Sequence, residues 1–279
     1  MLDVRNPRDR AIIEQITAAQ GGGGYGTQYQ AVYDSLTTKP SASIATAQNT
    51  MVTAIVNSGA WAKLDLFYMF AQTTNGGSEA LKNWINPGTF DATLTNAPAF
   101  VALEGFTPNG STSYIDTNYN LSSDGTNFVQ NSSSLGVYIR DTVADALKAL
   151  AGGLDVSPNT YTQIIPNYSG NWTAAINDAT NLSTANSSNE AGMYAIFRDN
   201  VNDVRSFKNF NIKSGSIASV GVPNEDLYIG CRNNNGSANA FSTYQMSWAF
   251  CGGTLTQTEF TNMTNAVEAY MVSNSKGVM

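Results

Sequence analysis

The pattern that most constrains the fold is a series of short strand-like runs that begins after Asn75-Gly76-Gly77. β-Branched and aromatic residues dominate the runs, whereas Asn, Gly and Ser dominate the connections. The chain holds 31 Asn, more than its 21 Asp and Glu together, and this composition favours turns over helices. Many short strands with frequent turns predict a mainly β fold, a two-sheet jelly-roll sandwich. The expected strands are 99–103, 113–117, 134–140, 161–166, 172–177, 192–198, 204–207, 226–232 and 243–250.

Helical patterns occupy the segment just before the sandwich. A helix is expected to begin at Ser41 or Ser43 and to end at Gly59, because its apolar residues recur with a 3.6-residue period. The aromatic-rich run 61–71 predicts one or two further helical turns, so 41–73 is a short helical segment ahead of the sandwich at 74–279. A short helical stretch is also expected at 143–150, closed by two glycines. The stripe of the first helix is Ile44, Ala47, Met51 and Ile55.

A last helix closes the chain. Thr256 and Glu259 have the spacing of a capping box, in which Thr is the N-cap and Glu reaches back from the third helical position. Its buried stripe is expected to contain Phe260, Met263, Val267, Tyr270 and Met271.

Residues 1–40 are expected to form a separate N-terminal arm. Asn6-Pro7 predicts a helix start, and the helix should run as far as the four glycines 21–24, which act as a hinge before a second short helix at 28–36. Two interpretations stay open: a flexible terminal arm, or a docking segment that orders only against a partner. In the second interpretation the docking residues are Arg5, Arg8, Ile12, Ile13 and Ile16.

Composition excludes several classes of function. The net charge of −7, with 14 Lys and Arg that do not cluster, argues against a nucleic-acid partner. No apolar run reaches the roughly 20 residues of a membrane span, and the charged N-terminus lacks the apolar core of a signal peptide. The chain has no His, which removes Ser-His-Asp and Cys-His catalysis and the commonest transition-metal ligand. We therefore expect no membrane partner, no metal and no cofactor.

The two cysteines allow two interpretations. Cys231 and Cys251 lie on the two strand-like arms of the stretch 227–253, so antiparallel pairing of these arms would bring the thiols close. Each also lies in an apolar run, where Cys behaves as a small buried hydrophobe. Buried thiols are favoured, and a disulfide stays open as the alternative.

Four segments occur in a recognisable order and spacing. They are ASIATAQNTMVTAIVNSGAWAKLDLFYMFA (42–71), LKNWINPGTFDATLTNAPAFVALEGFTPNGSTSYIDTNYN (81–120), GMYAIFRDNVNDVRSFKNF (192–210) and LYIGCRNNNGSANAFSTYQMSWAFCGGTLTQTEFTNMTNAV (227–267). Together they resemble the concanavalin A-like (laminin-G-like) sandwich domains of bacteriophage virion proteins and related bacterial surface proteins. The resemblance covers about residues 42–272. It implies that GMYAIFR and SFKNF form a central hairpin and that the closing helix covers one edge of the sheets. It implies no activity, because the fold hosts lectins, hydrolases and structural modules alike.

Catalytic and calcium-binding patterns are weak. A glycosidase needs two carboxylates about 5–9 Å apart, and no Glu-x-Asp-x-Glu places such a pair on one strand face. Only long-range pairs such as Glu104 with Asp116 are left, so we do not expect an enzyme. The segment DTNYNL (116–121) begins like a calcium loop, but Leu121 replaces the glycine of the sharp turn. The oxygen-rich segment 199–203 is interpreted as an Asx-rich hairpin turn.

Carbohydrate binding would require aromatic platforms beside amide and hydroxyl groups. The tip RNNNG (232–236) is interpreted first as a turn, although an Arg beside Asn amides also suits a sugar or a carboxylate. Aromatic residues near Asn- and Ser-rich stretches would supply the platforms, while core packing is their commoner role. The candidate ligand-binding residues are Arg232, Asn233, Asn234, Asn235, Trp172 and Tyr168.

These features favour a non-enzymatic virion structural protein, such as a head fibre, a decoration protein or a tail appendage. Its N-terminal arm would attach it, and the sandwich would be displayed outward. The alternative is a lectin-like module that binds host-surface glycan. The expected partners are capsid or tail proteins, host glycan and other copies of the chain, with a trimer as the first choice because appendages sit on symmetric particles. The expected location is the virion, after synthesis in the host cytoplasm.

Overall fold

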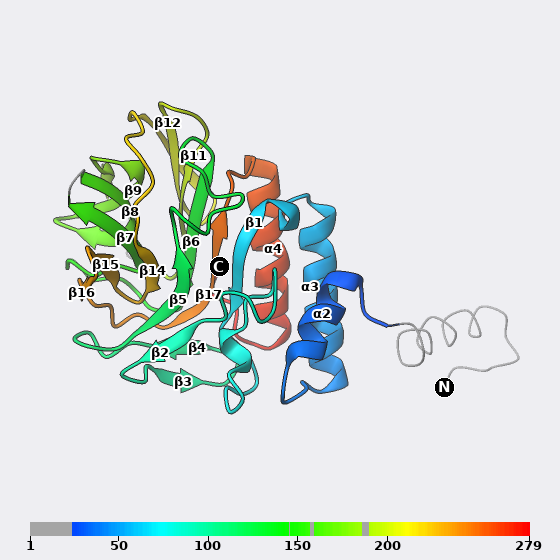
Figure 1. Cartoon of the computed structure of the whole chain (residues 1–279). Coiled ribbons are helices and arrows are strands. Elements are labelled where there is room, and N and C mark those ends of the chain that lie inside the picture. Colours follow the sequence, from blue (N-terminus) through cyan, green and yellow to red (C-terminus); the bar gives the residue numbers. More distant parts are fainter. Residues whose placement is uncertain (1–23, 145, 157–158, 186–189) are drawn as a thin grey trace, which may run out of the picture.

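Two mainly antiparallel sheets face each other in the computed structural model, which describes residues 24–144, 146–156, 159–185 and 190–279 (Figure 1). The helices α2, α3 and α4 cover the outer face of one sheet, so the described residues form three layers. The predicted mainly β sandwich with a C-terminal helix is confirmed. Within the described ranges, no helix is long and apolar enough to cross a membrane.

Sheet A lies between the helices and the other sheet. Its strand order is β13-β12-β11-β6-β17-β4-β3, and β1 also pairs with β17. Every residue of the central strands β6, β11 and β17 is buried. Both faces of these strands are covered, and their sequences are accordingly rich in apolar residues on both faces. The bounds are β1 Leu64–Met69, β3 Ala99–Val101, β4 Gly105–Thr107, β6 Ser133–Ile139, β11 Gly192–Arg198, β12 Asp203–Lys208, β13 Asn211–Ser216 and β17 Met246–Gly252.

Sheet B forms the other layer of the sandwich. Its strand order is β10-β9-β8-β7-β14-β5-β2, and the hairpin β15-β16 joins it through a parallel pairing of β15 with β7. The bounds are β2 Thr93–Thr95, β5 Tyr114–Asn120, β7 Ala151–Val156, β8 Asn159–Tyr168, β9 Asn171–Asp178, β10 Leu182–Ala185, β14 Asp226–Ile229, β15 Arg232–Asn234 and β16 Ser237–Asn239.

The apolar residues that sheet B contributes to the core lie at positions that pair with one another across its strands. One row of paired residues crosses the whole sheet, and all of its members are apolar and pack toward sheet A. Since side chains alternate between the faces of a strand, the next row must point outward. The inward row is Leu94, Ile115, Ile229, Ala151, Ile164, Ala174 and Leu182.

The helical layer has its own core against sheet A. Phe260 of α4 packs against Phe197, Phe207 and Phe250 of sheet A, with ring centroids 4.6–6.3 Å apart. The capping box predicted at the start of α4 is present. This helix covers the outer face of sheet A, not the sheet edge expected from the resemblance. The bounds are α2 Thr27–Ser35, α3 Ala42–Asn57 and α4 Gln257–Ser273.

Three local predictions are corrected. Within 61–71, only Trp61–Lys63 is helical, and Leu64–Met69 is strand β1. The described residues of 143–150 form no helix. The short helix expected at 28–36 is present as α2, but it is not part of a separate arm, because its Tyr29 and Val32 are buried in the helical layer. The docking residues proposed at positions 5–16 lie outside the described residues.

The stretch 227–253 is not one hairpin. Its first arm, β14, belongs to sheet B, and its second arm, β17, belongs to sheet A. Cys231 and Cys251 are therefore carried by different layers, and both are buried free thiols. Burial raises the pKa of each thiol, so neither is poised as a nucleophile.

Candidate functional site

The outward face of sheet B carries a second register row, which we call the outer row. Across the strands β2, β5, β14, β7, β8 and β9, paired backbone positions align one residue away from the apolar inward row. Its members are polar, aromatic or small, in contrast to the inward row. The outer row is Thr93, Asp116, Tyr228, Gly152, Gln163 and Ala175.

Gly152 creates a gap in the middle of the outer row. A Cβ built on this glycine would lie 3.0 Å from the Cβ of Arg232 and 3.0 Å from the Cβ of Gln163. Only a residue without a side chain lets the hairpin β15-β16 approach the sheet this closely. Arg232 therefore lies over the outer row, although its own strand is at the side of β7.

The Arg232 guanidinium is fixed by amides. Its Nε donates to Oδ1 of Asn239 at 2.8 Å, and its Nη1 donates to Oε1 of Gln163 at 2.8 Å. Gln163 in turn donates from Nε2 to Oδ1 of Asn181 at 2.9 Å. Burial lowers the pKa of Arg232, but the group stays protonated at neutral pH. The result is a chain of oriented polar groups along one face of the sheet.

A pair of tyrosines adjoins this polar chain. The rings of Tyr228 and Tyr114 stack with centroids 4.5 Å apart, and Phe241 lies 6.3 Å from Tyr114. All three side chains are half-buried. Burial raises the pKa of Tyr228, and the nearby Asp116 acts in the same direction, so the phenol stays neutral and keeps its hydroxyl donor.

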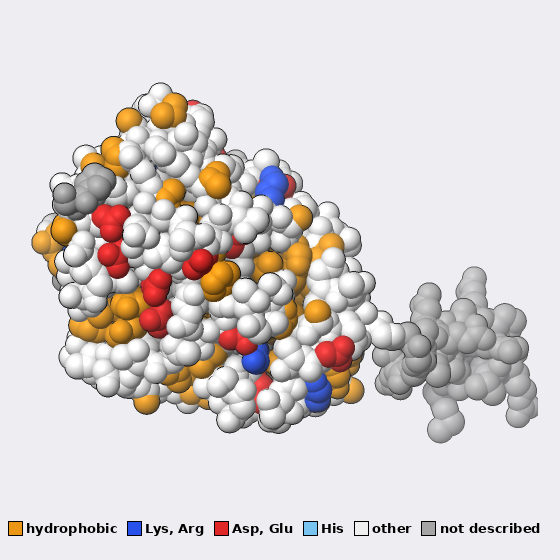
Figure 2. Space-filling model, viewed as in Figure 1, with side chains coloured by type: hydrophobic (Ala, Val, Ile, Leu, Met, Phe, Trp, Pro, Cys, Tyr) orange, Lys and Arg blue, Asp and Glu red, His pale blue; other side chains and the backbone are white. Residues whose placement is uncertain are grey.

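Carboxylates border the tyrosine pair. Burial raises the pKa of Asp116, and Asp226 adds to the effect. Burial also raises the pKa of Glu225, and Asp155 and Asp226 add to it. Figure 2 shows acidic and hydrophobic side chains gathered side by side over this part of sheet B. Among the described residues, no group of three His, Cys, Asp or Glu side chains is arranged to hold a metal ion.

The tip of the hairpin β15-β16 is a tight turn. Asn235 and Gly236 both have positive φ, 52° and 80°, as a two-residue type I′ turn requires. The buried Asn233 accepts the Gly236 N–H at 2.9 Å and donates to the Asp226 carbonyl at 3.2 Å. These bonds hold the turn, and Arg232 is the candidate residue of the tip whose side chain reaches the outer row.

The two predicted aromatic platforms have different positions. Trp172 is 4% exposed in the sandwich core and stacks on Tyr194, which is the placement of a core side chain. Tyr168 is 45% exposed at the end of β8, beside the turn to β9. Glu104 does not form a pair with Asp116, because it contacts Lys276 beside sheet A, whereas Asp116 lies on sheet B.

Of the outer row, the sequence patterns single out Asp116 alone, as a weak catalytic or calcium-binding candidate. The available signal was the alternation in SYIDT and DLYI, where Tyr114, Asp116 and Tyr228 alternate with apolar residues. That alternation identifies an outward face, but only the register brings the three side chains together.

No protein-family model matches this chain, and no curated protein matches it. Solved structures do match. Domain 4 of an extracellular arabinanase from Geobacillus stearothermophilus, solved in complex with arabinotriose, is 18% identical over 72% of this chain and 98% of that domain, with a TM-score of 0.49. The binding domain of botulinum neurotoxin serotype D is 12% identical over 77% of this chain and 53% of that chain, with a TM-score of 0.48.

A third match covers less. The NanB sialidase from Streptococcus pneumoniae is 16% identical over 47% of this chain and 23% of the sialidase, with a TM-score of 0.39. The chain thus spans about half of the neurotoxin domain and a smaller part of the sialidase. At such low identities and TM-scores, none of these similarities assigns a ligand, and the fold assignment rests on the strand order of the two sheets.

Proposed function

We propose that this chain is a non-enzymatic binding module whose outer row binds a neutral glycan. The observation that supports it most directly is the pairing of the Tyr114–Tyr228 aromatic surface with the fixed polar chain through Arg232. Sugars present apolar C–H faces and a ring of hydroxyls, so they need a stacking surface beside oriented hydrogen-bonding groups. Arg232, oriented by the buried Gln163, can donate to hydroxyl oxygens, and Asp116 can accept from hydroxyls.

The local charge defines the class of glycan. Four carboxylates lie near β14: Asp226 acts on Asp116, and Asp155 and Asp226 act on Glu225, whereas Arg232 contributes one guanidinium to the outer row. Acidic sugars would be repelled by this surplus of negative charge. The proposed ligand is therefore an uncharged oligosaccharide.

The test is a panel of neutral and acidic oligosaccharides, screened on an array and measured by calorimetry. Tyr228→Ala should weaken binding of the selected neutral glycan about tenfold, equivalent to about 1.4 kcal/mol. Tyr168→Ala is the matched control, because this tyrosine is exposed on the same sheet but outside the outer row. Loss of binding with Tyr168→Ala but not with Tyr228→Ala would move the site to the β8–β9 turn. Absence of binding across the panel would reject the function.

We further propose that the module is displayed on a bacteriophage particle. The support is the order and spacing of the four sequence segments that resemble virion sandwich domains, together with a glycine-linked segment ahead of α2. Light scattering of the full chain tests the oligomer that a particle appendage requires. A trimeric mass supports display, and a monomer at all concentrations counts against it while leaving the glycan proposal standing.

A further inference from the structure

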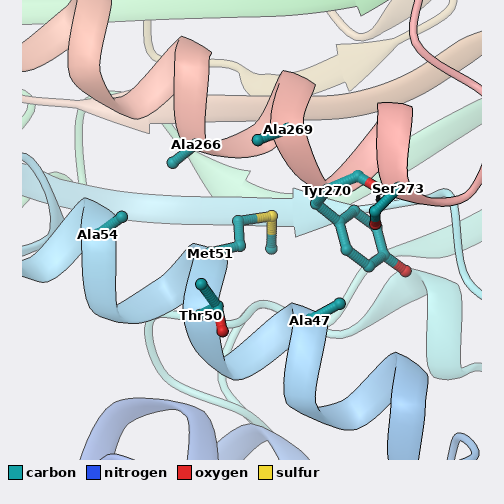
Figure 3. Close-up of a pocket in the computed structure, with 8 residues that line it drawn as sticks. All are labelled: Ala47, Thr50, Met51, Ala54, Ala266, Ala269, Tyr270 and Ser273. Carbon is teal, nitrogen blue, oxygen red and sulfur yellow. Dashed lines mark hydrogen bonds between the residues drawn. The ribbon is translucent and has the colours of Figure 1, made fainter.

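A groove runs between α3 and α4 on the side of the helical layer that faces away from sheet A. Figure 3 shows its walls, and the groove has a volume of about 240 Å³. Met51 and Tyr270 form its floor and are 2% and 3% exposed. The side chains of its walls are small, so they leave an apolar slot between the two helices. The wall residues are Ala47, Thr50, Ala54, Ala266, Ala269 and Ser273.

The described chain begins on a different flank of α3 from the one that lines the groove. The Gly26 N–H donates to Oδ1 of Asn49 at 2.8 Å, and Gly26 also lies next to Thr53. Asn49 and Thr53 directly precede two groove residues, Thr50 and Ala54, on α3. Adjacent residues of a helix point about 100° apart, so the chain starts on one flank of α3 and the groove lies on a neighbouring flank.

The sequence before Gly24 has the length and the composition to fill the groove. Four glycines, 21–24, extend to about 13 Å, which is enough to cross one helix of about 10–12 Å diameter. The predicted helix ahead of them, residues 6–20, would be about 22 Å long, close to the roughly 24 Å of α3. Ile12, Ile13 and Ile16 lie on one face of that predicted helix, and Ala19 extends the same stripe.

We propose that residues 6–20 bind as a helix in the α3–α4 groove of their own chain, with Ile12, Ile13 and Ile16 against its alanines. The short linker favours the chain's own groove over that of another copy, because it keeps the segment at a local concentration on the order of millimolar. Attachment of the chain to a particle through this segment would then require its release from the groove. The inference stands independently of the glycan-binding proposal.

Disulfide trapping in the full chain tests the placement. Ile12→Cys combined with Ala54→Cys should oxidise to a cross-link within one chain of 29.7 kDa. The native Cys231 and Cys251 do not compete, because both are buried. Ile12→Cys with Ser237→Cys, on the hairpin of sheet B, is the control pair and should not cross-link. A cross-link between two chains would overturn the proposal in favour of a second copy, and equal yields for both pairs would overturn it altogether.

A second variant tests the groove without added cysteines. Ala54 is exposed, so Ala54→Trp should fold and fill the slot. Trypsin should then cut after Arg10 at least tenfold faster than in the unmodified chain, because the displaced segment loses its protection. Ser237→Trp, at an exposed position on the hairpin of sheet B, should leave the rate unchanged. Rapid cleavage of the unmodified chain, at the rate of Ala54→Trp, would overturn the proposal.

Discussion

The two sheets of this sandwich differ in what covers their outer faces. Sheet A is covered by α2, α3 and α4, and its three central strands are wholly buried. Among the described residues no helix covers the outer face of sheet B, and its outward row contains the half-buried Asp116 and Tyr228. Apolar packing on both faces stabilises the first sheet, whereas the second leaves polar and aromatic groups available to a ligand. We therefore expect the packing of sheet A to contribute most of the stability, and the proposed glycan binding to depend on the open face of sheet B.

The strongest test of this division is a truncation in the covered face. Phe260 is fully buried among Phe197, Phe207 and Phe250, so Phe260→Ala should lower the free energy of unfolding by about 3–5 kcal/mol. Tyr228→Ala, on the open face, should cost less than about 2 kcal/mol because this side chain is only half-buried. Urea unfolding followed by tryptophan fluorescence measures both. Equal losses would remove the distinction between the two faces.

The next test concerns the ion pair that joins the sheets. Arg198 of β11 donates to Asp178 of β9 at 2.9 Å, and both side chains are at most 1% exposed. Burial raises the pKa of Asp178 to about 6, against the opposing effects of the Ile176 N–H and of Arg198. The folded pKa lies above the unfolded value of about 3.9, so the folded state binds more protons between these values. The contribution of Asp178 to stability therefore falls as the pH rises from about 4 to about 6.

The measurement is the loss of unfolding free energy on Asp178→Asn at several pH values. The loss should be greater at pH 4 than at pH 7, by up to about 3 kcal/mol, since a pKa gap of about two corresponds to this energy. A loss that grows toward pH 7 would show that the ionised pair stabilises the junction of the sheets.

Sequence patterns predicted the strands where turn chemistry and periodicity agree. The range 192–198 coincides with β11, and Thr256 with Glu259 located the start of α4. Strand β1 was missed because LDLFYM is a continuous apolar run, and such a run does not distinguish a strand buried on both faces from a helix. Strand β7 was missed because Gly152 and Gly153 were interpreted as a stop signal for a helix.

The candidate site was less predictable than the fold. The Asn235-Gly236 turn follows from local chemistry. The position of Arg232 over Gly152, in contrast, depends on the pairing of β15 with β7, two strands that are some 80 residues apart in sequence. The stack of Tyr114 on Tyr228 likewise depends on the pairing of β5 with β14. No local pattern encodes these registers, so they could not be read from one sequence.

A smaller effect is expected where the open face is itself closely packed. In Gly152→Ala the new methyl group would lie 2.9 Å from the Thr162 carbonyl oxygen and 3.0 Å from the Arg232 Cβ, which should cost about 1–3 kcal/mol. Because Arg232 would be displaced, glycan affinity should fall as well. Gly221→Ala meets only ordinary contacts at 3.7 Å or more and is the matched control, with a change below about 0.5 kcal/mol. If Gly152→Ala has no more effect than this control, Arg232 is not held against the sheet as described.

The smallest effect is expected at the N-terminal cap of α4, one of the helices that cover sheet A. Thr256 Oγ1 accepts the Glu259 N–H at 3.2 Å, and Glu259 accepts both the Thr256 N–H and Lys63 Nζ at 2.7 Å. Thr256→Ala should therefore lower the unfolding free energy by about 1 kcal/mol. Ser41→Ala, which removes the cap of α3, should cost less, because that bond is 3.5 Å long and exposed. Thermal unfolding of the two variants side by side measures the difference. A greater loss of unfolding free energy in Ser41→Ala would mean that the N-cap of α3 contributes more to the stability of the helical layer than the N-cap of α4.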